Sequence, residues 1–458
     1  MPFRISKLTV KYNLEITLSY FRIVLIINFV FVIVTYFTFI YCIHAMPSPI
    51  QNLHYVKDPN LEAKIVFTGL KFPTSMAFLG PDDILVLEKD EGTVNRIVNG
   101  TMLSEPLLKV PIANDGERGM LGIAVTKNKG HIFVFLYYTQ SGGGKTGDDV
   151  SQGIEPLGNR LYKYELINNK LVNPKLLLNI PAASVKLPND HVGGKLLVGL
   201  DQNIYLIVGN IGDHQTITQN FPSVLPPIGS VIYRISQNGD AVGSILGDSD
   251  PINKFYAYGI RNSFGMDFDP ITGNLWDTEN GPNYGDEINL VQPGFNSGWA
   301  QVQGIWKPNG EEIGPVIPNP PSGLVDFGGK GKYRPPEFIW KETVGPTAIK
   351  FLNSTKLGKQ YENDIFVGDV DYGNIYHFKL NQNRTGLVLD GILANKIANR
   401  SLDSKSIIFA RGLDPIVDMQ VGPDGYLYVL SLGHGDFEKQ ENKQTNGGTI
   451  YKIGPKSP

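Results

Sequence analysis

Residues 261–299 read RNSFGMDFDPITGNLWDTENGPNYGDEINLVQPGFNSGW. Two short apolar segments in this stretch, 266–268 and 275–276, are separated by the turn formers Asp, Pro, Gly and Asn, so the pattern predicts a β-hairpin. Asn, Asp, Glu and Gly crowd the turns that follow, and their oxygens could converge on one hard cation such as calcium. Taken singly, each of these residues is also a common turn cap.

The same hairpin pattern occurs five more times along the chain. The paired segments are 76–78 with 84–86, 123–125 with 132–134, 196–198 with 204–206, 348–351 with 365–367, and 419–421 with 427–429. Six hairpins predict an all-β fold, a six-bladed β-propeller over residues 61–455, in which loops from several blades meet at one mouth of a central channel. A pair of β-sandwiches is the alternative, but no Pro/Gly/Ser-rich linker separates two domains.

The composition is that of an ordinary globular protein. Its 458 residues include 51 Gly and 31 Pro dispersed along the chain, as expected for short strands joined by tight turns. A net charge of -3 offers no electrostatic footprint for nucleic acid, so we expect no nucleic-acid partner. The single cysteine, Cys42, excludes a disulfide framework and a cysteine-based metal site or nucleophile in the globular domain.

The N-terminal region predicts a single-pass membrane anchor. Residues 23–43 form an almost unbroken apolar run of the length that crosses a bilayer as a helix, and the basic residues before it place residues 1–22 in the cytoplasm. We therefore expect residues 44–60 to be a linker and the propeller to lie outside the cell membrane. A cleavable signal peptide is the alternative. Four glycosylation sequons would be usable there, at Asn99, Asn353, Asn383 and Asn399.

The most suggestive histidine is His191, which lies in a loop just before the third hairpin. An imidazole there could take a proton from a substrate hydroxyl, with Asp190 to orient it. A loop histidine is also commonly a plain surface residue. No histidine pair has zinc-type spacing, and no GxSxG, P-loop or dinucleotide glycine loop is present. Glu117, in ERGMLGIAV, is expected either to line the same mouth or to cap its turn.

Five segments carry a family resemblance: FPTSMAFLGPDDILVLEKDEGTV, GERGMLGIAV, NDHVGGKLLVGLDQNIYLIVGN, YGIRNSFGMDFDPITGNLWDTENGPNYGDEINLVQPGFNSGW and VGPDGYLYVLS. Through them, nearly the whole chain after the linker is similar to the glucose/sorbosone dehydrogenase family. These are soluble quinoprotein sugar dehydrogenases that use pyrroloquinoline quinone (PQQ) and calcium. The resemblance implies a six-bladed propeller that oxidises an aldose or sugar aldehyde and passes the electrons to an external acceptor.

The resemblance also implies roles for single residues. His191 would be the base toward the sugar hydroxyl, with Asp190 beside it, while hydride passes to the quinone. The residues expected at the cofactor are Gln215, Arg261, Asn262, Asn280, Trp340 and Thr343. The residues expected at calcium are Gly281 and Pro282, through their carbonyl oxygens, and the acidic pair Asp286 and Glu287.

The chain departs from the family pattern where two cations are expected at the carboxylates of PQQ. Asp371 or Tyr372 stands in place of a lysine, and Val417 in place of an arginine. The cations that could replace them are Arg411, Lys350 and Lys341, and Asn210 stands where the family has Asp. Two other functions therefore stay open: a non-catalytic, calcium-stabilised propeller that binds carbohydrate or protein at the surface, and a calcium-dependent lactonase-like propeller.

Overall fold

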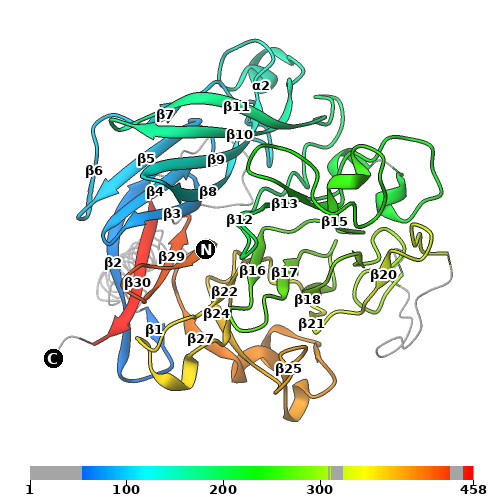
Figure 1. Cartoon of the computed structure of the whole chain (residues 1–458). Coiled ribbons are helices and arrows are strands. Elements are labelled where there is room, and N and C mark those ends of the chain that lie inside the picture. The colour runs from blue at the N-terminus through cyan, green and yellow to red at the C-terminus, as the bar shows by residue number, and fades with distance from the viewer. Residues whose placement is uncertain (1–53, 214, 308–309, 311–322, 434–446, 457–458) are drawn as a thin grey trace, which may run out of the picture. The chain divides into compact units, whose positions relative to one another are not determined.

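The described residues of this computed structural model are 54–213, 215–307, 310, 323–433 and 447–456. They form six sheets of mostly antiparallel strands arranged around a centre (Figure 1). The one α-helix among them is α2 (Asp148–Gln152), and the short 3-10 helices are Ile211–Asp213, Ile217–Gln219, Ile252–Lys254, Lys359–Tyr361, Gly391–Leu393 and Ser401–Ser406. The architecture is an all-β propeller.

The first three sheets follow one another along the chain. Sheet 1 contains β3 (Pro73–Gly80), β4 (Asp83–Glu88), β5 (Thr93–Val98), β6 (Thr101–Met102) and β7 (Leu108–Lys109). Sheet 2 contains β8 (Met120–Asn128), β9 (His131–Gln140), β10 (Gly158–Ile167) and β11 (Lys170–Ile180). Sheet 3 contains β12 (Leu196–Val198), β13 (Ile204–Val208), β14 (Val231–Ile235), β15 (Phe255–Tyr258), β19 (Phe295–Asn296) and β20 (Lys332–Tyr333).

The other three sheets complete the ring. Sheet 4 contains β16 (Gly265–Phe268), β17 (Leu275–Glu279), β18 (Asp286–Val291), β21 (Phe338–Trp340) and β26 (Ile397–Ala398). Sheet 5 contains β22 (Pro346–Phe351), β23 (Ile365–Asp369), β24 (Ile375–Leu380), β27 (Ile408–Arg411), β1 (Tyr55–Val56) and β25 (Leu387–Val388). Sheet 6 contains β28 (Ile416–Val421), β29 (Leu427–Ser431), β30 (Gly448–Pro455) and β2 (Leu61–Leu70).

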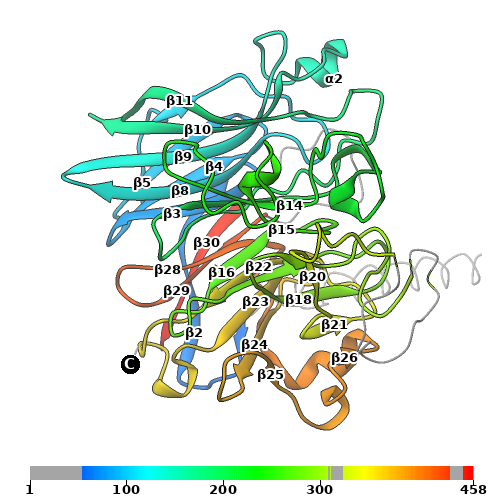
Figure 2. The same ribbon diagram turned by 45° about the vertical axis from the view of Figure 1, so that its right-hand side comes forward.

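All six predicted hairpins are confirmed, one in each sheet. They are the antiparallel pairs β3–β4, β8–β9, β12–β13, β16–β17, β22–β23 and β28–β29. The first strands of these hairpins contact one another in a closed circuit, from β3 through β8, β12, β16, β22 and β28 back to β3. Figure 2 shows the strands of sheet 2 lying side by side in one layer next to sheet 1.

The core lies between neighbouring sheets. Strand β13, IYLIV, shows why an unbroken apolar run forms here: Ile204, Leu206 and Val208 pack toward sheet 2, whereas Tyr205 and Ile207 pack toward sheet 4. Because successive side chains of a strand point to opposite faces, a strand covered on both faces needs apolar residues throughout. Comparable apolar clusters fill the other interfaces between adjacent sheets.

The two ends of the described chain close the ring. Strand β2, from the N-terminal side, pairs with β30, the last strand, so that sheet 6 draws strands from both ends. The paired strands begin before the expected boundary at residue 61, because β1 already pairs with β27 within the stretch expected to be linker. Residues from His54 onward group into one unit. The described helices are all too short to cross a membrane, and the predicted anchor at 23–43 falls outside the described residues.

Candidate functional site

Most of the predicted site residues lie in loops at one end of the ring, called the mouth below. Glu117, His191, Asn262 and Thr343 each stand shortly before the first strand of a sheet, β8, β12, β16 and β22. Asn280 directly follows β17, the second strand of sheet 4, which runs antiparallel to β16 and so returns to the same end. The ring thus brings together loops from four sheets.

His191 occupies a left-handed backbone conformation, with φ of 60°, and the two glycines that follow Val192 also have positive φ. The residue is buried, with a relative exposure of 8%. Its Nε2 lies 3.8 Å from Oδ2 of Asp190. This separation is longer than a hydrogen bond, and it leaves the charge of Asp190 next to the imidazole.

Glu117 holds the His191 turn against the loop of the next sheet. Its Oε2 accepts a hydrogen bond from the backbone N–H of Val192 at 3.1 Å. Its Oε1 accepts one from the side-chain amide of Asn262 at 3.1 Å. Burial raises the pKa of Glu117 to about 7, and the charge of Asp190 adds to this effect, while these hydrogen bonds oppose it. The carboxyl group of Glu117 therefore joins the turn that contains His191 to Asn262.

Gly209 brings His191 and Arg261 to within a few ångströms of each other. A Cβ atom at Gly209 would lie 2.7 Å from the carbonyl oxygen of His191 and 2.6 Å from that of Arg261. Those distances are shorter than any van der Waals contact, so only glycine lets the two loops approach this closely. The His191 turn and the Arg261–Asn262 pair are thus adjacent, as the sequence predicted.

Arg261 joins this cluster to the turn after β17. Its Nη1 donates to the carbonyl oxygens of Asn280 at 2.8 Å and Gly281 at 2.9 Å. Its guanidinium also lies over the ring of Trp299, 5.4 Å from the centroid, and its backbone N–H donates to Glu279. Burial lowers the pKa of Arg261, and nearby carboxylates oppose this effect.

Three buried polar atoms at the mouth have no hydrogen-bond partner among the described residues. They are Nε of Arg261, Oδ1 of Asn262 and Oδ1 of Asn280. Buried polar atoms are nearly always paired in folded proteins, so an unpaired donor beside two unpaired acceptors is typical of a ligand site. The arginine N–H suits an anionic or carbonyl oxygen, and the amide oxygens suit an N–H group or a hard cation.

Comparison with known families decides to which protein family the chain belongs. The model of the family described as "Glucose / Sorbosone dehydrogenase" matches residues 70–453, which is most of the chain. The chain belongs to the Glucose / Sorbosone dehydrogenase family. The resemblance drawn from the sequence motifs is confirmed, and so is the prediction that the chain is an enzyme of the oxidoreductase class.

Relatives within and around the Glucose / Sorbosone dehydrogenase family cover nearly the whole globular region. "Aldose sugar dehydrogenase YliI" of Escherichia coli is 25% identical over 402 residues, 87% of this chain and 94% of that protein. "Quinoprotein glucose dehydrogenase B" of Acinetobacter calcoaceticus is 25% identical over 453 residues, 85% and 89% of the two chains. The solved PQQ-bound form of an aldose sugar dehydrogenase from Streptomyces coelicolor has a TM-score of 0.60 at 21% identity, covering 86% and 98%, which supports the fold.

The predicted calcium ligands of this family member are engaged in other contacts. The carbonyl oxygen of Gly281 accepts from Arg261, while Pro282, beside it, is half-buried. Asp286 accepts backbone N–H bonds from Gly281, Val344 and Gly345 at 2.8, 2.7 and 2.9 Å. The carboxylate of Asp286 therefore fastens the Gly281 turn to the loop before β22. Among the described residues there is no group of three or more His, Cys, Asp or Glu arranged to hold a metal ion.

Glu287 points the opposite way from Asp286, because the two are consecutive on β18. It lies opposite Glu279 in the strand register, and Asp277 stands on the same face of β17. All three are almost completely buried. Burial raises the pKa of each carboxyl, and the charge of Glu279 raises those of Asp277 and Glu287 further. Of these three residues, sequence reasoning singled out only Glu287, as a calcium ligand, and missed Asp277 and Glu279, although both stand in the stretch from 261 to 299.

The structure does not bring Trp340 and Arg411 to the mouth. The indole of Trp340 is fully buried among the side chains between sheets 4 and 5, and its N–H donates to Oγ of Ser404 at 3.2 Å. Arg411 is exposed on an outer strand and lies over the ring of Tyr55. Thr343 is half-buried in the loop fastened by Asp286, and Gln215 is exposed after β13. We therefore leave Trp340 and Arg411 out of the proposed site.

The two lysines suggested as replacement cations each contact a different partner, and the contacts do not bring them to one site. Lys350 pairs with Asp267 at 2.9 Å, and Lys341 lies over the ring of Trp306. Val417 packs against the apolar cluster between sheets 6 and 1. The mouth thus carries one arginine, Arg261, within a largely acidic setting. Its charge balance differs from the one that the family pattern predicts.

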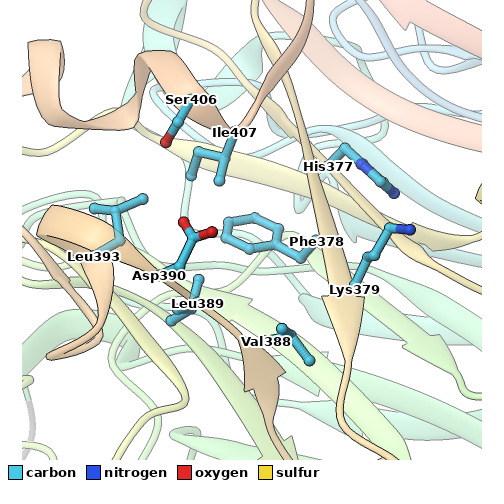
Figure 3. A pocket seen from close by; sticks show the side chains of 9 residues that line it. All are labelled: His377, Phe378, Lys379, Val388, Leu389, Asp390, Leu393, Ser406 and Ile407. Atoms are coloured by element: carbon cyan, nitrogen blue, oxygen red, sulfur yellow. The ribbon is translucent and has the colours of Figure 1, made fainter.

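A surface pocket of about 240 Å³ lies elsewhere, on the outer strands of sheet 5. Figure 3 shows Phe378, Asp390 and Ile407 around it, with His377 and Lys379 at one side. None of the predicted site residues lines this pocket, which is formed by β24, β25 and the turns that follow. The chemistry predicted from the sequence is therefore to be sought at the mouth.

Proposed function

We propose that the protein oxidises an aldose or a related sugar aldehyde with PQQ and calcium, using His191 as the base. One observation carries this proposal: the buried His191 turn, the Arg261–Asn262 pair and the Asn280–Gly281 turn meet at one mouth, where Arg261, Asn262 and Asn280 keep unpaired polar atoms. PQQ is supported by the names of relatives, "Quinoprotein glucose dehydrogenase B" and the PQQ-bound Streptomyces enzyme.

The residues of the mouth fit these cofactors in part. Arg261 would bind an oxygen of PQQ through its unpaired Nε, and Asn262 and Asn280 would accept an N–H group or contact calcium. The carbonyl oxygens of Gly281 and Pro282 would complete the calcium contacts, whereas Asp286 serves to hold their turn. When bound, PQQ accepts the hydride and calcium polarises its carbonyl as a Lewis acid.

The protein's own residues would handle the proton. His191 takes the proton of the hydroxyl on the carbon that loses hydride, so that this carbon becomes a carbonyl. The negative charge of Asp190, near Nε2, stabilises the imidazolium that forms. Glu117 keeps the imidazole loop next to Asn262. The electrons then leave to an external acceptor.

Six sheets in the described residues, with first strands in a closed circuit, support a propeller of six blades.

We extend the proposal to the location of the protein. Residues 23–43 would anchor it in the cell membrane as a single pass, residues 1–22 would be cytoplasmic, and the propeller, over residues 61–455, would be extracytoplasmic. A reporter enzyme active only outside the cytoplasm, fused after Pro458, tests this topology. An active fusion supports it, and activity of a cytoplasm-specific reporter in the same place contradicts it.

A second function is favoured by one specific observation. Gly281 and Asp286 already have partners within the protein, and Asp371 and Val417 put no cation near the mouth. These features suit a non-catalytic propeller, stabilised by calcium, that binds carbohydrate or protein at the surface. The two functions differ in whether PQQ binds at all.

The deciding experiment is a titration of the purified full chain with PQQ in calcium, followed by dye reduction with a panel of aldoses. Saturable PQQ binding with aldose-dependent dye reduction supports the dehydrogenase. His191→Gln should then abolish dye reduction while PQQ still binds, and His131→Gln, at an exposed histidine, is the matched control. Sugar binding without PQQ binding would establish the binding module instead. Full dye reduction by His191→Gln would remove His191 as the base.

A further inference from the structure

A buried ion pair joins Lys195, just before β12, to Asp418 in β28. Nζ of Lys195 donates to Oδ1 of Asp418. The relative side-chain exposures are 8% for Lys195 and 1% for Asp418. The other oxygen of Asp418 accepts from the hydroxyl of Ser75 at 3.0 Å and from the backbone N–H of Met76 at 2.9 Å. One carboxylate thus links its own strand, β28, to β3 and to the residue just before β12.

These three strands belong to different sides of the ring. Lys195 stands just before β12 in sheet 3, Asp418 lies in β28 in sheet 6, and Ser75 lies in β3 in sheet 1. In the circuit of contacts, sheets 3 and 6 are separated by two other sheets in either direction. The side chains of Lys195 and Asp418 therefore meet across the axis of the ring. Ordinary contacts between neighbouring sheets cannot provide such a link.

Lys195 is also the fourth residue after His191, and a glycine pair separates them. On one side of the glycines, Val192 is held by Glu117 and by the hydroxyl of Tyr137, which donates to its carbonyl oxygen at 3.2 Å. On the other side, the side chain of Lys195 is held by Asp418. The backbone of Gly194 and Lys195 also pairs with Ile207 of β13. Because glycine gains the most freedom when a restraint is lost, each of these attachments restrains the turn.

We propose that Lys195 and Asp418 form a floor across the channel beneath the mouth, and that Lys195 is the residue that positions the His191 turn from below. The catalytic consequence rests on the proposed function, but the floor and its effect on the turn do not. Lys195 is a positioning residue in this proposal, because it acts on substrate only through His191.

The experiment compares Lys195→Met and Lys195→Arg with the unchanged full chain by hydrogen exchange of backbone amides, resolved by peptide mass spectrometry. Lys195→Met should raise exchange in the peptide that contains Val192 to Leu196 by about tenfold, with exchange in β9 and β10 unchanged. Lys195→Arg keeps the charge and should restore slow exchange. An unchanged peptide in Lys195→Met, or an equal rise in all six sheets of the double variant described next, would overturn the proposal.

A second variant guards against misfolding. Lys195→Met leaves Asp418 charged and buried without its partner, which is strongly destabilising, so the double variant Lys195→Met with Asp418→Asn removes both charges. It should show the same local rise in exchange.

If the chain oxidises aldoses, Lys195→Met should lower kcat by about tenfold while KM stays within about twofold. If the unchanged chain has no such activity, the proposed function fails, and hydrogen exchange alone still decides the floor.

Discussion

Glu117 and Asn262 are joined by a hydrogen bond of 3.1 Å, although 145 positions separate them in the sequence. The second oxygen of the same carboxylate accepts the N–H of Val192, next to His191. Both oxygens of the Glu117 carboxyl group thus accept a hydrogen bond, one from each loop. Glu117 therefore couples the position of the imidazole to that of Asn262.

Replacing Glu117 by Gln should lower kcat/KM for aldoses by about 10-fold to 100-fold, equal to about 1–3 kcal/mol. The amide N–H₂ of Gln would face one of the two donors, so one contact of the clamp is lost. Dye reduction measures the effect, and Glu105→Gln, at an exposed position, is the control. Equal activity of the two variants would show that the clamp has no catalytic role.

Asp286→Asn should weaken PQQ binding by about tenfold or more and lower the free energy of unfolding by about 1–3 kcal/mol. Three backbone N–H groups donate to Asp286 and hold the Gly281 turn, and the amide of Asn cannot accept all three. Fluorescence titration with PQQ and urea unfolding measure the two effects. Asp248→Asn, at an exposed aspartate, should change neither quantity. Unaltered PQQ affinity in Asp286→Asn would separate this turn from the cofactor.

Trp340→Phe should lower the free energy of unfolding by about 1–3 kcal/mol and leave PQQ affinity within about twofold. The reason is that the indole fills the core between sheets 4 and 5 and donates its N–H to Ser404, so that the fully buried ring is not available to a ligand. Urea unfolding and PQQ titration of the same preparation check this. A large loss of PQQ affinity at unchanged stability would show that Trp340 contacts the cofactor, as the sequence predicted.

The protein should be more stable near pH 5.5 than near pH 8. Burial raises the folded-state pKa of Glu117 to about 7 and raises those of Asp277 and Glu287, so the folded protein holds these protons more tightly than the unfolded chain. That stabilisation is complete below the unfolded-state pKa of about 4 and is lost as the pH rises through the raised folded-state values.

The substitution Glu287→Gln isolates the contribution of the Glu287 carboxyl to the pH dependence of stability. Asn289 can turn its amide toward the new N–H₂ group, because its Oδ1 has no partner among the described residues, so the variant should fold. Its free energy of unfolding should fall less between pH 5.5 and 8 than that of the unchanged protein. Urea unfolding at the two pH values measures the difference. An identical pH dependence would mean that Glu287 does not titrate differently in the folded state.

Calcium should bind detectably only together with PQQ. The guanidinium of Arg261 occupies the carbonyl oxygen of Gly281 and repels a divalent cation there, and an anionic cofactor would draw this charge away. Titration calorimetry should show no saturable heat for calcium alone and saturable heat in the presence of PQQ. Tight binding of calcium alone, retained in Arg261→Met, would place the metal elsewhere.

Local sequence patterns were sufficient for the hairpins and for the loops that carry chemistry. The segments around Met266 and Leu275 pair as expected, because alternation and turn residues act over a few positions. The positions of His191, Arg261 and Asn280 before first strands or after second strands followed from the same logic. Trp340 could not be placed in this way, since an aromatic residue at the end of a strand suits a core and a ligand site equally well.

By itself, the sequence determined that this protein is built from hairpins with apolar faces, that His191 lies in a loop, and that polar turns connect the short strands of the stretch from 261 to 299. Only the tertiary structure decided which turns meet. Lys195 and Asp418 are 223 positions apart, and their contact exists because a closed ring of sheets places opposite strands across one axis. Hairpin pairing is a local property of the chain, whereas contacts across the channel depend on closure of the whole ring.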